Sequence, residues 1–189
     1  MNPVNRDKFF FAFSGQFGPV ADGLDDALDT ILSFLEHDER MSDIRWVCYA
    51  LATAWHETGK TMLPIKEFSR GKGLPYGKPD PQTGKTYYGR GYVQLTWKDN
   101  YAAMGKVCGA DFVTDPDLVM KPEYAYRIMS YGMRNGSFTG AALSRYFNDD
   151  RTDPVSARKI INGLDCAEKI AQYYENFMTI FKEITDDPL

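Results

Sequence analysis

The sequence is poor in the residues that build metal sites and disulfide frameworks. It holds two histidines and three widely spaced cysteines in 189 residues. No pair of cysteines forms a CxxC motif and no Cys/His cluster occurs, so we expect no metal and no other cofactor. An odd number of scattered cysteines also indicates a chain whose thiols are reduced.

Long apolar runs and basic runs are missing as well. The five-residue apolar run at residues 9–13 follows mixed charges and is too short for the core of a secretory signal peptide. No stretch approaches the length of a membrane span, so we expect no membrane insertion. The formal net charge is −4 and no run of Lys and Arg offsets it, which argues against nucleic acid as a partner.

The composition that remains is that of one soluble, mainly helical domain. Hydrophobic residues make up 43% and charged residues 25%, which is ordinary for a globular protein of this length. Apolar residues from Leu24 to Leu35 recur at helical spacing, and the uncharged run 46–55 predicts a helix over 43–56 that is buried on nearly every side. Further helices are predicted at 122–134, 139–147, 154–161 and 165–184.

A segment rich in glycine and proline, residues 60–85, shows no periodicity. A loop of this length in a compact domain is usually functional or disordered, and its neighbours favour function. After it, β-forming residues on both sides of Gly-Arg-Gly predict a short hairpin at 86–96. Arg90 in this hairpin either lines a cleft or braces the hairpin against a buried acid, and we favour bracing. Thr96, with Asp99 three positions later, predicts the N-cap of the next helix.

Two glutamates ten residues apart are candidate catalytic carboxylates. Glu57 ends the apolar helix, where a carboxylate is costly unless it is hydrogen-bonded, protonated or exposed in a cleft. Glu67 lies beyond the break at Gly59 and Pro64, at the start of the loop. One acid near apolar surface and one in a polar loop can take the two roles that glycoside hydrolysis requires. A solvated helix end is the alternative for Glu57, and Asp80 in the same loop is the alternative to Glu67.

Three segments, in order along the chain, resemble family 19 glycoside hydrolases. They are residues 54–59 (AWHETG), residues 87–96 (YYGRGYVQLT) with the following Asn100, and residues 160–165 (IINGLD). That family contains plant-type chitinases and many phage endolysins, within the lysozyme-like superfamily. The resemblance implies a mainly α, lysozyme-like, two-lobed helical domain with a small β-hairpin beside the active-site cleft.

The resemblance also implies a role for each matching residue. Glu57 is implied to be the general acid, Glu67 the general base, and Thr96 the residue that helps to hold the attacking water. Gln94 and Asn100 match sugar-contacting positions in the cleft. The other candidate substrate-binding residues are Asn162, which matches the Asn of the third segment, and Lys169, His56 and Tyr88.

Some of these candidates have a structural alternative, and some positions depart from the plant pattern. His56 could act on Glu57 or be a buried structural histidine, and residues 162–163 could be only a turn between helices. The aromatic residues of the hairpin region, such as Tyr88, could stack on sugars or pack in the core. Lys169 stands where the plant enzymes usually carry Arg and lacks its bidentate fork. Trp55 stands where they often carry a histidine.

Together these expectations describe one catalytic domain over residues 1–189, in which N-terminal helices within 1–40 pack on a catalytic core at 41–185. We expect a monomeric, inverting glycosidase that cleaves β-1,4 bonds in an N-acetylhexosamine polymer. Peptidoglycan ranks above chitin, because the chain is shorter than plant chitinases and has no signal peptide, as in phage endolysins. The protein would then be made in the cytoplasm and reach the cell wall after release or export by another system. A chitinase is the alternative, and an inactive wall-binding module on the same scaffold is the second alternative.

Overall fold

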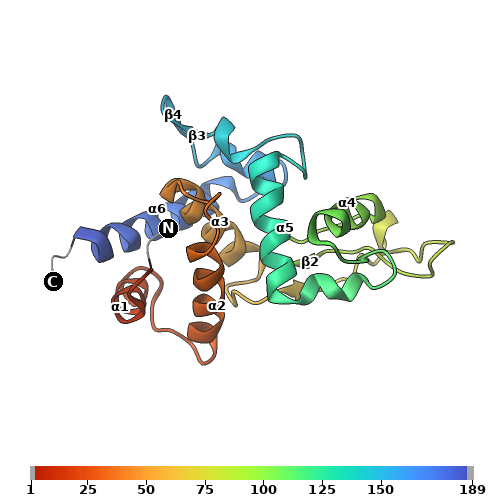
Figure 1. Cartoon of the computed structure of the whole chain (residues 1–189), viewed down its shortest axis with the longest axis horizontal. Helices are drawn as coiled ribbons and strands as arrows, with labels where there is room; N and C mark the ends of the chain where they lie inside the picture. Colours follow the sequence, from red (N-terminus) through yellow and green to blue (C-terminus); the bar gives the residue numbers. More distant parts are fainter. Residues whose placement is uncertain (1–2, 187–189) are drawn as a thin grey trace.

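Helices dominate the computed structural model, which describes residues 3–186 (Figure 1). The α-helices are α1 (Arg6–Phe17), α2 (Leu24–Glu36), α3 (Ile44–Glu57), α4 (Lys98–Cys108), α5 (Pro122–Asn135) and α6 (Ala167–Asp186). Between them lie the 3₁₀ turns η1 (Pro75–Gly77), η2 (Pro116–Met120), η3 (Leu143–Arg145) and η4 (Ser156–Ile160), and the strands β1 (Ile65–Lys66), β2 (Arg90–Gly91), β3 (Phe147–Asn148) and β4 (Arg151–Thr152). The predicted mainly α class is confirmed.

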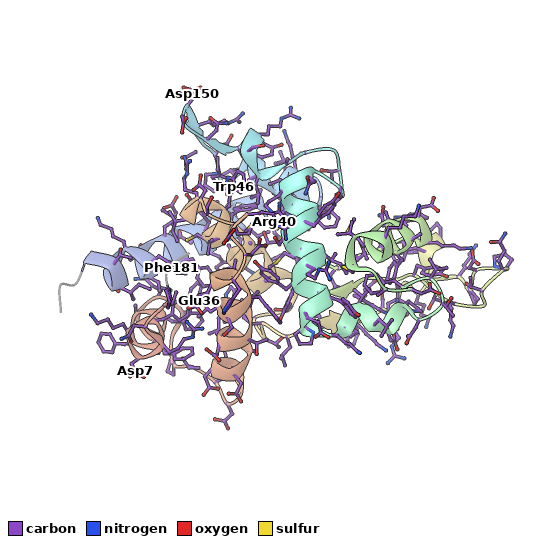
Figure 2. All side chains as sticks on the ribbon, viewed as in Figure 1. Asp7, Glu36, Arg40, Trp46, Asp150 and Phe181 are labelled. Atoms are coloured by element: carbon purple, nitrogen blue, oxygen red, sulfur yellow. The ribbon has the colours of Figure 1, made fainter. Side chains whose placement is uncertain are left out.

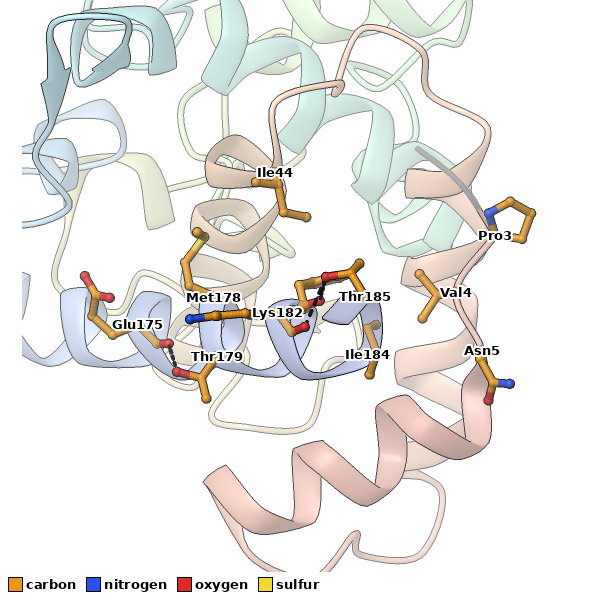
Figure 3. A pocket seen from close by; sticks show the side chains of 11 residues that line it. Pro3, Val4, Asn5, Ile44, Glu175, Met178, Thr179, Lys182, Ile184 and Thr185 are labelled. Carbon is orange, nitrogen blue, oxygen red and sulfur yellow. Dashed lines mark hydrogen bonds between the residues drawn. The ribbon is translucent and has the colours of Figure 1, made fainter. Parts of the chain in front are cut away.

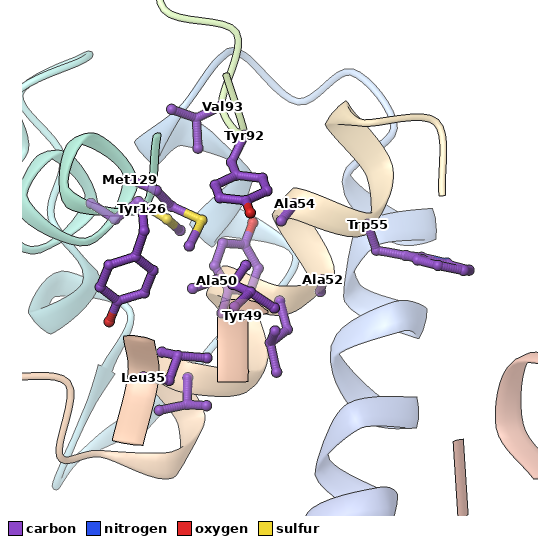
Figure 4. Close-up of a cluster of buried hydrophobic side chains, with 14 of the residues drawn as sticks. Leu35, Tyr49, Ala50, Ala52, Ala54, Trp55, Tyr92, Val93, Tyr126 and Met129 are labelled. Atoms are coloured by element: carbon purple, nitrogen blue, oxygen red, sulfur yellow. The ribbon is translucent and has the colours of Figure 1, made fainter. Parts of the chain in front are cut away.

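The core is built around α3, the helix that the uncharged run predicted. Asp43 caps its N-terminus by accepting a hydrogen bond from the amide of Arg45, and every residue from Val47 to Trp55 is buried. Burial on all sides explains why this helix carries no polar face. It packs along α6 and also contacts α5. Figure 4 shows Tyr49, Ala50 and Ala54 of α3 within the buried cluster.

The two N-terminal helices pack on this core from one side. The apolar stripe of α2, from Leu24 to Leu35, is buried as its spacing predicts, and α2 contacts α5. The helix α1 lies against α6. Arg6 of α1 donates to Glu36 at the end of α2, with 2.6 Å between Nη1 and Oε1, and Figure 2 labels this glutamate between the two helices.

Trp55 shows why the chain departs from the plant pattern at that position. Its ring is 4% exposed and packs edge-to-face on Phe13 of α1, with 5.5 Å between centroids. It also contacts Phe17, at 5.1 Å. A large apolar side chain here fills the space between α3 and α1, which the smaller, polar histidine would leave poorly packed.

The predicted hairpin at 86–96 is wrong in its pairing. Strand β2 pairs antiparallel with β1, with Ile65 opposite Gly91 and Lys66 opposite Arg90. Only a single bridge, between Arg90 and Leu95, closes within the predicted hairpin. The backbone turns sharply at Gly91, where φ is +86°, so the ladder cannot continue. The long loop therefore supplies the partner strand, which periodicity alone could not indicate.

Two predicted helices are shorter and tighter than expected. The segment 139–147 holds only η3 and then β3, which pairs with β4. Gly140, with φ at +85°, interrupts any helix there. The segment 154–161 forms the 3₁₀ turn η4 rather than an α-helix. The helices predicted at 122–134 and 165–184 are confirmed as α5 and α6.

The predicted N-cap at Thr96 is wrong. Helix α4 starts one residue later, with Trp97 in the N-cap position and no side-chain cap. Trp97 has φ at +72°, and its amide donates to the carbonyl of Tyr87 at 2.9 Å. The Trp97 amide is thus tied to the preceding segment, so the chain turns into the helix after Thr96. Across residues 3–186, no helix has the length and apolar character needed to span a bilayer.

Candidate active site

Glu57 is the last residue of α3 and is held by a single arginine. Nη1 of Arg158, in η4, donates to Oε1 of Glu57 at 2.5 Å. The arginine side chain is 4% exposed and that of the glutamate 15% exposed. The other oxygen of Glu57, Oε2, has no hydrogen-bond partner among the described residues. The carboxyl group is therefore fixed at one oxygen and free at the other.

Arg158 is in turn fixed by the turn that follows it. Its Nε donates to the carbonyl of Asp165 at 3.0 Å, and its own carbonyl accepts the amide of Asn162 at 3.0 Å. Residues 162–165 thus wrap around the arginine. Nothing in the sequence pattern singled Arg158 out. The only available signal was that a carboxylate at the end of a buried helix needs a cationic or hydrogen-bonding partner.

Asn162 and Lys169, the other candidates in this part of the chain, are both exposed. The side chain of Asn162 accepts the amide of Gly163 at 2.8 Å, as in a turn. Lys169 is on the first turns of α6 and is exposed. The described ion pair of Glu57 is with Arg158. Arg158, rather than Lys169, therefore supports the Glu57 carboxylate.

His56 precedes Glu57 and is half-buried. Burial lowers the pKa of His56, the negative charge of Glu57 opposes that effect, and Arg158 and Lys169 add to the lowering. A lowered pKa keeps the ring neutral over a wider pH range. The same charges show that His56 lies in the electrostatic field of the Glu57 group.

Glu67 follows β1 directly and is held by three donors. Oε2 accepts the amide of Gly89 at 3.1 Å. Oε1 accepts the hydroxyl groups of Ser69 at 2.6 Å and of Tyr76 at 3.4 Å. The backbone is tied to the same place, because the amide of Glu67 donates to the carbonyl of Gly89 at 2.7 Å. The β1–β2 pairing thereby sets the position of this carboxylate.

Gln94 packs against the same glycine. A Cβ atom at Gly89 would lie 2.8 Å from Oε1 of Gln94. Nε2 of Gln94 donates to the carbonyls of Ile65 at 3.1 Å and Gly91 at 3.2 Å. Glu67 and Gln94 therefore share one small platform made by β1, Gly89 and β2.

Thr96 and Asn100 form a second linked pair. Nδ2 of Asn100 donates to the carbonyl of Thr96 at 2.9 Å. The hydroxyl group of Thr96 has no partner among the described residues, and the side chain is partly exposed. With the capping role excluded, this hydroxyl group is available to hold a water molecule.

Tyr88 offers little surface to a sugar. It is 7% exposed, and the guanidinium group of Arg90 lies 3.7 Å from the centre of its ring. Arg90 braces this region, as we favoured. Its Nη1 donates to the hydroxyl group of Tyr101 and to the carbonyls of Thr86 and Tyr88. Its acid partner is Asp117, at 2.8 Å, whose side chain is 54% exposed rather than buried.

Asp80, the alternative to Glu67, is occupied by other contacts. Its Oδ1 and Oδ2 accept Nζ of Lys98 at 2.9 and 3.0 Å. Its Oδ1 also accepts the amides of Gln82 and Thr83. A carboxylate that organises a turn and pairs with a lysine has few lone pairs left for a substrate water.

Two sizeable cavities of the molecule do not coincide with these carboxylates. One, of about 710 Å³, lies between residues 3–5 and residues 175–185 of α6, and is shown in Figure 3. Another, of about 800 Å³, lies among α2, α4 and α5. Within residues 3–186, no group of three or more His, Cys, Asp or Glu side chains is placed to hold a metal ion.

Residues 70–130 match the family model of the class I chitinases of glycoside hydrolase family 19. An endochitinase of Arabidopsis thaliana is 41% identical over 85 residues, which cover 44% of this chain. The chain spans 30% of the length of that relative. The matched segment of this chain contains Gln94, Thr96 and Asn100 but neither Glu57 nor Glu67.

Solved structures of similar fold align with nearly the whole chain. Chitinase C from Streptomyces griseus aligns with 96% of this chain and 76% of its own, at a TM-score of 0.57 and 24% identity. A bacterial family 19 chitinase aligns with 94% of both chains, at a TM-score of 0.58 and 22% identity. The resemblance predicted from the sequence is confirmed. The ranking of peptidoglycan above chitin is not supported, because the matched proteins named above are chitinases.

Proposed function

Since the chain is related to the family 19 glycoside hydrolases, we propose that it hydrolyses β-1,4 bonds in chitin, with inversion at the anomeric carbon. The observation that carries the proposal is the Glu57 carboxyl group, fixed by Arg158 at one oxygen and free at the other. A general acid needs that arrangement, because its free oxygen must carry a proton to a defined point of the substrate.

In the acid step, Oε2 of Glu57 delivers its proton to the glycosidic oxygen as the bond from that oxygen to the anomeric carbon breaks. Arg158 and the turn at 162–165 hold the carboxyl group in one orientation. Asn162, His56 and Lys169 are the proposed contacts for the sugar on the same side.

In the base step, Glu67 accepts a proton from a water molecule that attacks the anomeric carbon from the opposite face. The donors from Gly89, Ser69 and Tyr76 fix the Glu67 carboxylate. The free hydroxyl group of Thr96 is the proposed second contact of that water. This route requires the two carboxyl groups to stand about 6.5–9.5 Å apart, so that a water fits beyond the sugar ring.

Gln94 and Asn100 are the proposed sugar-binding side chains on the base side, because Gln94 shares a platform with Glu67 and Asn100 is tied to Thr96. Tyr88 is proposed to act through Arg90 and the platform rather than by stacking on the sugar. A polymer of this kind lies outside the cytoplasm, so the proposal also requires that the protein be released or exported.

The test is the anomer formed in the first turnover. Chitohexaose would be hydrolysed in an NMR tube, with the anomeric proton of the new reducing end recorded before mutarotation. We expect the α-anomer to appear first, since inversion at a β-linkage produces α. Glu57→Gln, with equal folding by circular dichroism, should produce neither anomer. Appearance of the β-anomer first would contradict the mechanism.

The same preparation separates the alternatives for substrate. Purified peptidoglycan has a β-1,4-linked N-acetylhexosamine backbone and would be incubated beside colloidal chitin. Release of sugar from chitin supports the proposal. Clearing of peptidoglycan without release from chitin would point to the endolysin alternative, and binding without hydrolysis of either would point to an inactive module.

A further inference from the structure

The 800 Å³ cavity among α2, α4 and α5 carries an excess of positive charge on a protein whose net charge is −4. Three arginines line it: Arg40, Arg127 and Arg134. The only carboxylate among its lining residues is Asp38. Figure 1 shows α5 between α2 and α4, and Figure 2 labels Arg40 beside α5. None of these residues belongs to the proposed active site.

The carboxylate of Asp38 cannot pair with all three arginines, because both of its oxygens already accept other hydrogen bonds. Oδ2 of Asp38 accepts the hydroxyl groups of Ser130 at 2.5 Å and Tyr126 at 3.1 Å. Oδ1 accepts the amide of Arg40 at 3.2 Å and its Nε at 3.3 Å. The Asp38 side chain is 9% exposed. It therefore acts as a structural anchor of the wall.

Arg134 is oriented by this anchor. Its Nε donates to Oγ of Ser130 at 3.3 Å, and Ser130 is bonded to Asp38. The two terminal nitrogens of Arg134 have no hydrogen-bond partner within residues 3–186, although the residue is half-buried. Burial lowers the pKa of Arg134, the negative charge of Asp38 opposes that effect, and the charge of Arg40 adds a smaller lowering. Arg40 and Arg134 are thus close enough for their like charges to act on each other.

The other two arginines differ in what they have left to donate. Arg127 uses both terminal nitrogens on the carbonyls of Cys108 and Val107, at the end of α4. Arg40 uses only its Nε, and its side chain is 74% exposed. Arg40 and Arg134 thus present four unpaired terminal nitrogens around one cavity. A guanidinium group pairs best with a carboxylate or a phosphate, through two parallel hydrogen bonds.

We propose that this cavity binds an oxyanion, a phosphate or carboxylate group, between Arg40 and Arg134. An anion there balances the charge of the two guanidinium groups and accepts hydrogen bonds from their terminal nitrogens, which Asp38 does not contact. The volume lies within the range of small-molecule sites, so the anion can be part of a larger molecule. The rings of Phe34 and Tyr126, stacked at 5.2 Å, form an apolar part of the wall. Chitin carries no anionic group, so this ligand differs from the proposed substrate.

The test is calorimetric titration of the whole protein with inorganic phosphate and, separately, with acetate, at constant ionic strength. We expect saturable binding of at least one of them. Arg134→Gln should weaken it about tenfold, the effect of one charge-assisted hydrogen bond, and Arg40→Gln should weaken it in the same direction. Arg145→Gln, which changes an exposed arginine outside the cavity, is the matched control and should leave binding unchanged.

Two further measurements separate binding from folding. Arg134→Lys keeps the charge and should retain more affinity than Arg134→Gln. Saturating phosphate or acetate, whichever binds, should raise the melting temperature of the wild type more than that of Arg134→Gln. Absence of saturable binding of both anions, or equal loss in Arg145→Gln and Arg134→Gln, would overturn the proposal. Preference for phosphate over acetate, or the reverse, would identify the oxyanion.

Discussion

A buried guanidinium group determines how the Glu57 carboxyl group is presented. Arg158 is fixed on its other side by the carbonyl of Asp165, so it orients the glutamate rather than following it. The exposed Lys169 cannot replace this support, because an ammonium group is a point charge without a fixed fork. The residue that completes the proposed acid thus lies 101 positions away in sequence.

Replacing Arg158 by methionine should therefore lower activity and stability together. The change leaves Glu57 without its partner, and we expect a loss of about 1–3 kcal/mol in the free energy of unfolding. Loss of orientation should reduce kcat about a hundredfold or more, with a smaller change in KM. Urea denaturation and chitohexaose kinetics measure both. Arg145→Met is the control, and equal kcat in the two variants would argue against a positioning role.

The choice of base can be decided at two single positions. Glu67→Gln should remove activity, because an amide cannot accept the proton of the attacking water, and added azide should restore turnover by replacing that water. Asp80→Asn should keep most of the activity, because Asp80 is occupied by Lys98 and by its own turn. Initial rates with and without azide are the measurement. The reverse result, activity lost only in Asp80→Asn, would assign the base to Asp80.

Among the secondary-structure elements, the loop between β1 and β2 is the one that positions the base. It crosses itself at two glycines. A Cβ atom at Gly77 would lie 2.0 Å from the carbonyl oxygen of Gly71, which leaves no room for any side chain. This crossing supports Tyr76, whose hydroxyl group contacts Glu67 and whose ring packs edge-to-face on Trp97 at 5.4 Å. The loop is thus a folded support and not a flexible connection.

Gly77→Ala should distort this support. Because the clash is with backbone rather than with a side chain tip, the crossing must open, and we expect kcat to fall while the helical circular dichroism signal stays the same. Gly15→Ala, in α1, has nothing within 4 Å of its Cβ atom and should leave kcat unchanged. If Gly77→Ala kept wild-type kcat, the loop would have no part in holding Glu67.

Across the whole molecule, the packing surfaces of α3 are separate from the end of the helix that reaches the candidate site. Its sides pack on α6 and α5, with Trp55 against the aromatic face of α1, and its last two residues, His56 and Glu57, reach the candidate site. The N-terminal helices therefore contribute packing and no side chain to the proposed reaction. This separation lets a core substitution change stability without changing the reaction.

Phe13→Ala should lower the free energy of unfolding by about 3–5 kcal/mol, the usual cost of truncating a buried aromatic ring. Phe13 is 1% exposed and stacks on Phe17 at 4.7 Å. We expect kcat per folded molecule to stay unchanged. Phe11, on the same helix, is 85% exposed, so Phe11→Ala should change stability by no more than about 0.5 kcal/mol. Equal destabilisation by both substitutions would contradict the packing described for α1.

The sequence by itself determined the helical class, the buried central helix, the amphipathic α2 and the family resemblance. These features depend on local periodicity and on the order of short motifs, both of which can be read from the sequence alone. It also placed Glu57 at a helix end and Glu67 at the start of a loop, although their catalytic roles remain predictions.

Only the tertiary structure decided the contacts between distant segments. Arg158 meets Glu57, and β1 supplies the strand that pairs with β2. Asp38 contacts Arg40 and, through Ser130, Arg134, in a cavity that no motif marks. These outcomes depend on which turns close and which side chains then fill the remaining space. Gly91, Trp97 and Gly140 show the reason most directly: their left-handed backbone conformations end or redirect an element that residue pattern alone would have continued.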